Sequence, residues 1–338
     1  MKNAATIFLV GLSLLGAAGW TGCSLFQSEA SPRDAQTPAF PRPAEGEFSV
    51  MTFNLNQYAL LDRDGDADTL EPKPPAEAGA IVEVIRQVSP DILAVQEMGD
   101  PAAWAEFKYS LRQAGLEYGH EEYLRNGNSE LNLAVLSRFP IVARNPHTDD
   151  RYTIGPTQFP VQRGILEVDI QVRPDYRLRL MATHLKSKVF HEYGQAEMRR
   201  NEARLLNNHV RDSLEETPDI NLLVVGNLSD TPASKLLSDI LTYQDQALLH
   251  DLRPTDSAGD AWTYRESDDS CQRIDYMLLS DGLLPEVNVD KTYAVRSRPL
   301  LQASSHRPLV ATFMATEQGS ESAPDLSKGL PPVFPEND

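Results

Sequence analysis

Apolar and polar side chains alternate with two different periods between residues 47 and 314. A period of two, or a short uninterrupted apolar run, is typical of a β-strand. The predicted strands cover residues 48–55, 92–95, 131–136, 164–172, 178–184, 222–225, 274–279 and 309–313. Apolar residues three and four apart predict amphipathic helices at 76–88, 102–114 and 192–215. Because strands outnumber the helices between them, the pattern favours two packed β-sheets covered by helices.

Neither a linker nor a repeat interrupts this segment, so we expect one domain over residues 47–314. It contains no run near the roughly 18 apolar residues that a spanning helix needs, which predicts a soluble body. The flanking segments differ in composition. Residues 24–46, rich in Pro, Ser and Ala, predict a flexible linker, and residues 315–338 predict a disordered tail.

Residues 1–23 have the order of a secretory signal peptide. Lys2 supplies a positive charge, residues 7–15 are apolar, and small residues follow. The segment ends in Gly22-Cys23 and resembles a bacterial lipoprotein signal, in which the cysteine becomes the lipidated first residue. We therefore expect an extracytoplasmic lipoprotein, anchored to a membrane through Cys23. Simple secretion is the alternative.

The cysteine count agrees with that interpretation. The chain has two cysteines, Cys23 and Cys271. If Cys23 carries lipid, Cys271 has no partner in the chain, and no disulfide framework is expected. The alternative is a disulfide between the two.

The formal net charge of −18 limits the classes of partner. An acidic surface repels nucleic-acid phosphates and anionic membranes, whereas non-specific DNA binding needs a basic surface. The charge does not exclude nuclease chemistry, but it argues against a general DNA-binding protein. An anionic substrate must be held by a local positive patch or by a metal ion.

Chemically capable residues recur where the predicted strands end. They are Asn54, Glu97, His184, Asn227, Asp230, Asp275 and His306. A single polar residue after a strand means little, because every strand must end in something polar. So many strand ends that carry Asn, Glu, Asp or His are more than this general need for a polar residue explains. The strand ends of one sheet meet at one edge, so we expect a shared cleft.

These side chains suit phosphoester cleavage. Glu97 is a hard oxygen ligand of the kind that holds Mg²⁺. His184 and His306 suit acid–base work or hydrogen bonding to a phosphate. Asp275 suits the orientation of one imidazole.

Positive charge is concentrated around His184 in the sequence. The cationic residues are Lys186 and Lys188 and, on the predicted helix that follows, Arg199, Arg200 and Arg204. Lys186 is therefore a candidate for phosphate binding. The alternative for the arginines is a solvated helix face paired with Glu197 and Glu202.

Seven segments together carry a family resemblance. They are TFNLN at 52–56, AVQEMG at 94–99, LSRFPI at 136–141, THLKSK at 183–188, LLVVGNLSDTP at 222–232, RIDYMLLS at 273–280 and ASSHRPLVATF at 303–313. Their order resembles that in the endonuclease/exonuclease/phosphatase superfamily, which includes DNase I-like nucleases, sphingomyelinases and inositol phosphatases. The resemblance covers about residues 47–314. It implies a DNase I-like α+β fold, a four-layer αββα sandwich of two facing β-sheets flanked by helices.

The resemblance also implies roles for five residues. Asn54 and Glu97 lie at the metal ion, Mg²⁺ or Mn²⁺, and at the phosphate. His184 contacts phosphate, and Asp275 pairs with His306 in a dyad that acts on the scissile phosphate. The expected protein is a monomeric phosphoester hydrolase. Its substrate stays open between nucleic acid, a phospholipid headgroup and a small phosphoester.

Two motifs depart from the family pattern. The family has Gly-Asp-Phe-Asn-Asp where this chain has GNLSD at 226–230, and Ser-Asp-His where it has SSH at 304–306. By resemblance, Asn227 replaces the aspartate that activates water, and Ser229 replaces an asparagine that stabilises the transition state. Ser305 replaces an aspartate that supports the metal or the neighbouring histidine. Loss of a general base costs about 10²–10⁴ in rate, and loss of carboxylates weakens metal binding.

Two hypotheses follow from these departures. The first is a phosphoesterase with a degenerate site and weak activity. The second is a catalytically inactive pseudoenzyme that acts as an extracytoplasmic binding protein. Asp230 is a candidate replacement for the lost base, but we favour its alternative, a turn residue before Thr231-Pro232.

Asp62, Asp64, Asp66 and Asp68 alternate around Gly65. Alternating acidic residues near a glycine resemble a Ca²⁺-binding loop, although the glycine is misplaced for an EF-hand. The alternative is an acidic surface loop.

Overall fold

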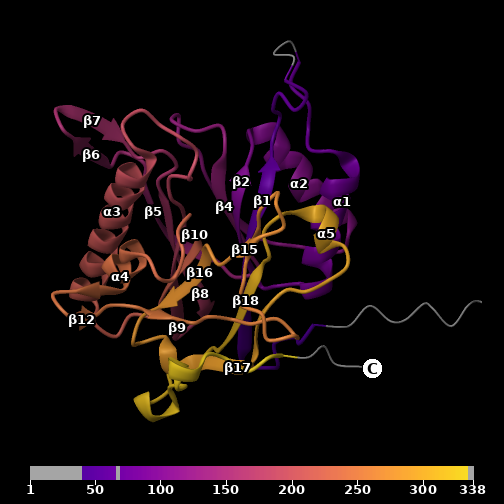
Figure 1. The fold of residues 1–338 in the computed structure, drawn as a ribbon. Helices are drawn as coiled ribbons and strands as arrows, with labels where there is room; N and C mark the ends of the chain where they lie inside the picture. Colours follow the sequence, from indigo (N-terminus) through magenta and orange to yellow (C-terminus); the bar gives the residue numbers. More distant parts are fainter. Residues whose placement is uncertain (1–39, 66–68, 334–338) are drawn as a thin grey trace, which may run out of the picture. The chain divides into compact units, whose positions relative to one another are not determined.

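Two mixed β-sheets of six strands each form the centre of the computed structural model, which describes residues 40–65 and 69–333 (Figure 1). The first sheet has the order β17 (Val287–Ala294), β18 (Leu309–Met314), β1 (Glu47–Tyr58), β2 (Ile92–Met98), β4 (Asn132–Ser137), β3 (His120–Leu124). The second has the order β13 (His250–Asp251), β16 (Asp275–Leu279), β10 (Leu222–Asn227), β9 (Tyr176–His184), β8 (Ile165–Arg173), β5 (Ile141–His147). The pairs β1–β2 and β9–β10 are parallel, and the other pairs in these sheets are antiparallel.

Helices cover the outer face of each sheet. The first sheet packs against α1 (Pro75–Val88), α2 (Pro101–Gln113) and α5 (Leu300–Ala303), and the second packs against α3 (Gln195–Glu216) and α4 (Lys235–Leu241). Three short hairpins are β6 (Arg151–Ile154) with β7 (Thr157–Pro160), β11 (Thr242–Tyr243) with β12 (Gln246–Ala247), and β14 (Tyr264–Arg265) with β15 (Cys271–Gln272). The 3₁₀ turns are η1 (Leu284–Glu286), η2 (Ser320–Ser322) and η3 (Leu326–Lys328). Within the described ranges, the helices are too short or too polar to span a membrane.

Strand β1 is buried on both faces, which explains its nearly continuous apolar sequence. Phe48 and Val50 lie in the core between the two sheets. Met51 and Phe53 point the other way and lie in the core beneath α1 and α2. The same alternation recurs in β10 beneath α3. Helices, sheet, sheet and helices therefore form four layers, which confirms the expected α+β sandwich.

The sequence pattern did not predict strands β3, β5 and β17, which lie at sheet edges. An edge strand has one neighbouring strand and is only partly covered, so its side chains need not be apolar. Val142 in β5, for example, is 47% exposed.

Both segments that flank the predicted domain extend its packing. Phe40 is buried, and its ring stacks on Tyr293 with 5.2 Å between the ring centroids. Leu330 is buried in the core between the sheets. Apolar side chains that leave water stabilise the backbone that carries them. Phe40 and Leu330 therefore pack against the core, while the flexible linker at 24–46 and the disordered tail at 315–338 stay predictions.

Candidate active site

Three neighbouring strands of the second sheet bring polar residues to the same level. Asn227 of β10 lies opposite His184 of β9 and opposite Asp275 of β16 in the strand register. This close approach requires glycine at position 226, where φ is 127° and an added Cβ would lie 2.0 Å from Thr183 O. The prediction that these strand ends converge is confirmed.

The first sheet supplies the groups that face them. Asn54 pairs in register with Gln96 of β2, and Glu97 follows at a β-bulge with a positive φ of 62°. Such a φ is rare for a residue other than glycine and is typical of a constrained position. Glu97 Oε1 lies 3.9 Å from His184 Nδ1, across the gap between the sheets. The expectation that one sheet carries all these groups is therefore wrong, because the ends of strands from both sheets meet here.

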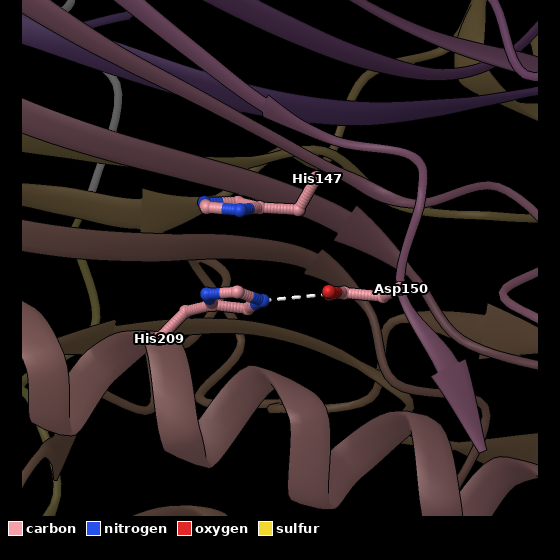
Figure 2. Close-up of side chains that lie close together, drawn as sticks. All are labelled: His147, Asp150 and His209. Carbon is pink, nitrogen blue, oxygen red and sulfur yellow. Dashed lines mark hydrogen bonds and ion pairs between the residues drawn. The ribbon is translucent and has the colours of Figure 1, made fainter.

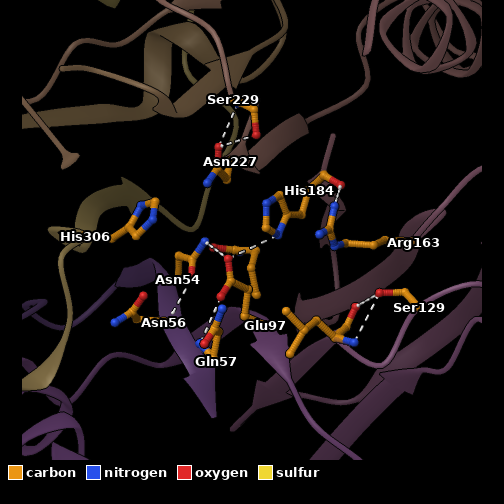
Figure 3. A network of polar contacts seen from close by, with 12 residues as sticks. Asn54, Asn56, Gln57, Glu97, Ser129, Arg163, His184, Asn227, Ser229 and His306 are labelled. Atoms are coloured by element: carbon orange, nitrogen blue, oxygen red, sulfur yellow. Dashed lines mark hydrogen bonds and ion pairs between the residues drawn. The ribbon is translucent and has the colours of Figure 1, made fainter. Parts of the chain in front are cut away.

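The Glu97 carboxylate is held by two donors (Figure 3). Its Oε1 accepts a hydrogen bond from Asn54 Nδ2 at 3.0 Å, and its Oε2 accepts one from the backbone N–H of Gln57 at 2.8 Å. Asn54 Oδ1 in turn accepts from the backbone N–H of Asn56 at 2.9 Å. The sequence did not single out Asn56 or Gln57, because they act through backbone groups.

His306 and Asp275 form the dyad that the resemblance implied. His306 Nδ1 lies 2.8 Å from Asp275 Oδ2, and both residues are buried. The hydroxyl of Thr263 accepts the backbone N–H of Asp275 at 3.0 Å, which fixes the start of β16. Burial alone would lower the pKa of His306, but the charge and hydrogen bond of Asp275 raise it above the ordinary value.

His184 lies in a different electrostatic setting. Its side chain is buried, and its Nδ1 has no hydrogen-bond partner among the described residues. Burial lowers the pKa of His184 well below the ordinary value, and the positive charges of Arg163 and His306 lower it further. The two histidines are therefore biased toward different forms, neutral at 184 and protonated at 306.

Asn227 is engaged by its own turn. Its Oδ1 accepts the backbone N–H of Ser229 at 2.7 Å and the Ser229 hydroxyl at 3.2 Å. The same hydroxyl lies 3.2 Å from Leu185 O. Ser229 has a positive φ of 54°, a conformation in which asparagine is more common than serine.

The segment before β18 joins the dyad to β1. Ser304 Oγ donates to Asn54 O at 2.9 Å and accepts the backbone N–H of His306 at 3.0 Å. Ser305 Oγ lies 3.5 Å from Asn56 Oδ1, at the limit of a hydrogen bond. Ser305 thus faces the turn that follows Asn54.

Two buried charged residues that the sequence analysis did not propose as site residues support the loop after His184. Arg163 Nη1 lies 3.4 Å from both His184 O and Leu185 O. Glu202 Oε2 accepts the backbone N–H of Lys186 at 2.6 Å. Burial raises the pKa of Glu202 and lowers that of Lys186. An arginine beside a strand and a glutamate on a polar helix look like surface residues, so the sequence carries no clear signal for either.

The remaining candidates divide by burial. Arg199 is buried and donates to Lys186 O at 3.1 Å, so the solvated-face alternative is wrong for this residue. Arg200 is exposed and pairs with Glu197, as that alternative expects. Asp230 Oδ1 accepts the backbone N–H of Thr231 at 2.9 Å, a turn contact, and its Oδ2 lies 3.5 Å from Arg199 Nε. This geometry agrees with the turn-residue interpretation of Asp230.

Glu97 is the carboxylate best placed for a divalent ion. Its oxygens are hard ligands, and Mg²⁺ is commonly held by one or two carboxylates together with water and substrate phosphate. Asn54 Nδ2 faces Glu97 and its Oδ1 accepts from Asn56, so the Asn54 amide would have to turn to join Glu97 as a ligand. These residues therefore fit an ion that keeps most of its water. Asn227 and Ser305 add no negative charge to the site. Within residues 40–65 and 69–333, the grouping of three metal-ligating side chains lies elsewhere, on β5, α3 and the loop before β6.

The acidic loop is described only in part. Asp62 Oδ1 accepts the backbone N–H of Gly65 at 2.7 Å. Asp66 and Asp68 lie outside the described residues. Ca²⁺ binding by Asp62, Asp64, Asp66 and Asp68 therefore stays a prediction.

A model of the Endonuclease/Exonuclease/phosphatase family matches residues 51–292. The chain belongs to this family. Its members are phosphoester hydrolases that generally use a divalent metal ion. The matched region contains the strand-end residues from Asn54 to Asp275. Ser305 and His306 lie beyond its end. Among curated protein sequences, none matches this chain.

Several solved structures share the fold. Truncated TDP2 from Caenorhabditis elegans is 18% identical, with a TM-score of 0.56 over 80% of this chain and 98% of that one. The human Nocturnin catalytic domain with bound sulfate is 17% identical, with a TM-score of 0.57 over 80% and 95%. Sphingomyelinase C from Streptomyces griseocarneus is 17% identical, with a TM-score of 0.51 over 79% and 99%. At such identities, the likeness shows the fold and not the substrate.

Proposed function

We propose that this chain is a metal-dependent phosphoesterase of low turnover with a degenerate active site. One observation carries the proposal. The His306–Asp275 dyad, at 2.8 Å, is intact, while the neighbouring strand end carries the amide of Asn227. The site thus keeps the groups that hold and protonate a phosphoester but has an amide and no carboxylate at position 227.

The two histidines take different parts in this proposal. Asp275 occupies Nδ1 of His306, which leaves Nε2 to donate to a phosphoryl oxygen. The charge and hydrogen bond of Asp275 raise the pKa of His306, which favours the protonated donor. The lowered pKa of His184 keeps its imidazole neutral beside Glu97. Groups whose pKa values are pushed apart in this way are typical of acid–base sites.

The proposed defect lies at Asn227. Its Oδ1 already accepts two hydrogen bonds from Ser229, and an amide cannot take a proton from water. Without a general base, turnover should fall by about 10²–10⁴ relative to a complete site. A divalent ion at Glu97 and Asn54 would supply charge neutralisation at the phosphoryl oxygens.

The charge around the site favours a small phosphodiester over a long nucleic acid. A cleft of about 380 Å³ is lined by His306 and four arginines. The arginines are Arg265, Arg296, Arg298 and Arg307. Asp256 pairs with Arg307 at 2.9 Å and with Arg296 at 3.2 Å, and Arg265 lies 3.9 Å from Asp269. Arg265, Arg296 and Arg298 are exposed. Local positive charge of this kind holds an anion, while the net charge of −18 repels a polyanion.

A second candidate function is a binding protein without catalysis. The observation that favours it is the closed turn at Asn227, whose side-chain oxygen is satisfied within the turn. The two candidates predict different responses to restoration of the missing groups.

The test is hydrolysis of bis(p-nitrophenyl) phosphate with Mg²⁺ or Mn²⁺. The proteins are wild type, His306→Ala, and the triple variant Asn227→Asp, Ser229→Asn, Ser305→Asp. We expect slow metal-dependent hydrolysis by wild type, none above background by His306→Ala, and a gain of at least about tenfold in the triple variant. Ordinary family-level turnover by wild type would refute the degenerate site. Activity that survives His306→Ala would place the chemistry elsewhere.

The cellular location is a further part of the proposal. We propose that the mature chain is a monomer outside the cytoplasm with lipid on Cys23, which lies outside the described residues. The support is the order of charge, apolar run and small residues before Cys23. Mass spectrometry of the mature amino terminus from the native host tests it. A chain that still begins at Met1 would refute it.

A further inference from the structure

A second group of chemically capable side chains lies away from the strand-end site. His147 ends β5, Asp150 lies in the loop before β6, and His209 is on α3 (Figure 2). One potential ligand atom from each lies within 4.8 Å of the other two. All three residues are partly buried, so an ion could reach them without unfolding.

The contacts in this cluster orient both imidazoles. His209 Nε2 lies 2.6 Å from Asp150 Oδ2. The ring of His147 stacks on that of His209 with 3.7 Å between centroids. His147 Nε2 lies 2.9 Å from Glu167 Oε2, so the other ring nitrogen, Nδ1, is the candidate ligand atom of His147.

The backbone around the cluster is held firmly. His147 pairs in register with Ile165 of β8. Gly164 has a φ of 79°, and a Cβ there would lie 2.6 Å from His147 O, so the two segments pass at contact distance. Asp150 O accepts the backbone N–H of Val161 at 3.0 Å. The backbone of His147 is therefore held at the end of the sheet, that of Asp150 is held to Val161, and α3 brings the third ligand.

We propose that His147, Asp150 and His209 form a binding site for a transition metal ion, for which Zn²⁺ is the fitting ion. Two imidazoles and one carboxylate are a zinc ligand set, whereas Mg²⁺ and Ca²⁺ prefer oxygen ligands. A carboxylate behind a ligating histidine, here Glu167 behind His147, fixes the ring and strengthens the ligand. Water completes the four-coordinate site.

Metal binding requires a small, definite rearrangement. Zinc bonds of about 2.0–2.2 Å in a tetrahedral arrangement separate ligand atoms by roughly 3.4 Å. The Asp150 oxygen must therefore move away from His209 Nε2, from which it lies at 2.6 Å. A metal ion also lies in the plane of each ligating ring, so the ring stack must open. Both changes are side-chain rotations.

The site would link α3 to the loop between β5 and β6. Helix α3 also carries Glu202, which accepts the backbone N–H groups of Gln162 at 3.1 Å and Lys186 at 2.6 Å. Zinc at the proposed site would thus stiffen the helix that supports the loop after His184. Its effect is structural and separate from the ion at Glu97.

The experiment is titration of the metal-free full chain with Co²⁺, followed by its visible absorption, and with Zn²⁺, followed by thermal unfolding. We expect one tetrahedral Co²⁺ ion per chain, seen by its visible bands, and a higher melting temperature with Zn²⁺. His147→Gln and His209→Gln should each weaken binding by at least roughly tenfold. Asp150→Asn provides a variant that keeps both rings.

Two controls separate this site from others. His250→Gln removes an imidazole that also lies 2.6 Å from a carboxylate oxygen, that of Asp281, and should leave binding unchanged. Glu97→Gln should also leave it unchanged, because Glu97 belongs to the other site. A wild type that binds no Co²⁺, or binding that survives all three cluster substitutions, would overturn the proposal.

Discussion

Asp275 Oδ2 and His306 Nδ1 lie 2.8 Å apart and join the two sheets of the sandwich. Asp275 begins β16 in the second sheet, and His306 lies three residues before β18 in the first. The pair is buried, so its electrostatic interaction is only weakly screened by solvent. Burial of His306 opposes its charge, and the carboxylate more than offsets that effect.

The first prediction concerns this pair. Replacement of Asp275 by Asn removes the charge that raises the pKa of His306 and leaves the burial that lowers it, so the pKa should fall. Histidine ring resonances in an NMR pH titration measure the change. Asp281→Asn, which removes the carboxylate beside His250, is the control and should leave His306 unaffected. If the pKa of His306 is unchanged in Asp275→Asn, a group other than Asp275 raises it.

The sequence identified most of the sandwich and the placement of the strand-end residues. Strands buried on both faces, such as β1 and β10, left long apolar runs. Helix α1 could be predicted from its apolar residues three and four apart between Ala80 and Val88. His184, Asn227 and Asp275 could be placed at one edge because each follows or begins an apolar run.

Other features left no local trace in the sequence. Edge strands β3, β5 and β17 are half exposed, so their polar residues look like loops. Gln57 acts through its backbone N–H, and Glu202 is buried by tertiary packing on a helix of polar composition. The proximity of Glu97 to His184 depends on how two sheets face each other, which no periodicity encodes.

A second prediction concerns the metal ion. Mg²⁺ should bind weakly to wild type and more weakly still to Glu97→Gln, because Glu97 is the carboxylate held by Asn54 and the backbone of Gln57. Isothermal titration calorimetry measures both affinities. The triple variant that restores carboxylates at 227 and 305 should bind more tightly than wild type. Tight Mg²⁺ binding that persists in Glu97→Gln would mean that the ion binds elsewhere, with the acidic loop at 62–68 as the next candidate.

A third prediction compares two glycine substitutions. Gly226→Ala should destabilise the fold by about 3 kcal/mol or more, because the new Cβ would lie 2.0 Å from Thr183 O at a φ of 127°. Gly79→Ala is the control. This glycine lies within α1 with no atom within 4 Å of an added Cβ, so alanine should stabilise the helix by about 0.5–1 kcal/mol. Urea unfolding curves give both values. A small effect at Gly226 would mean that the strands β9 and β10 can separate at this point.

A fourth prediction concerns a buried acid outside the candidate site. Glu286 is buried, and its carboxylate accepts a hydrogen bond from the hydroxyl of Tyr176. Burial raises the pKa of Glu286 from 4.5 to about 8, and the charge of Glu317 adds to the effect. The side chain is therefore expected to be protonated in the folded chain at neutral pH.

The sign of the pH dependence follows from that raised pKa. Below pH 4.5, Glu286 is protonated in both the folded and the unfolded chain. Between pH 4.5 and about 8 the unfolded chain releases this proton while the folded chain keeps it, so the free energy of unfolding falls as the pH rises. The loss is complete above that range and amounts to a few kcal/mol, since one pKa unit is worth roughly 1.4 kcal/mol.

Glu286→Gln keeps a neutral group that can still accept from Tyr176, so its stability relative to wild type should grow from pH 5 to pH 8. Thermal unfolding across this range measures it, with the exposed Glu117→Gln as a control that should show no such trend. A constant difference between Glu286→Gln and wild type would mean that Glu286 is ionised in the folded chain.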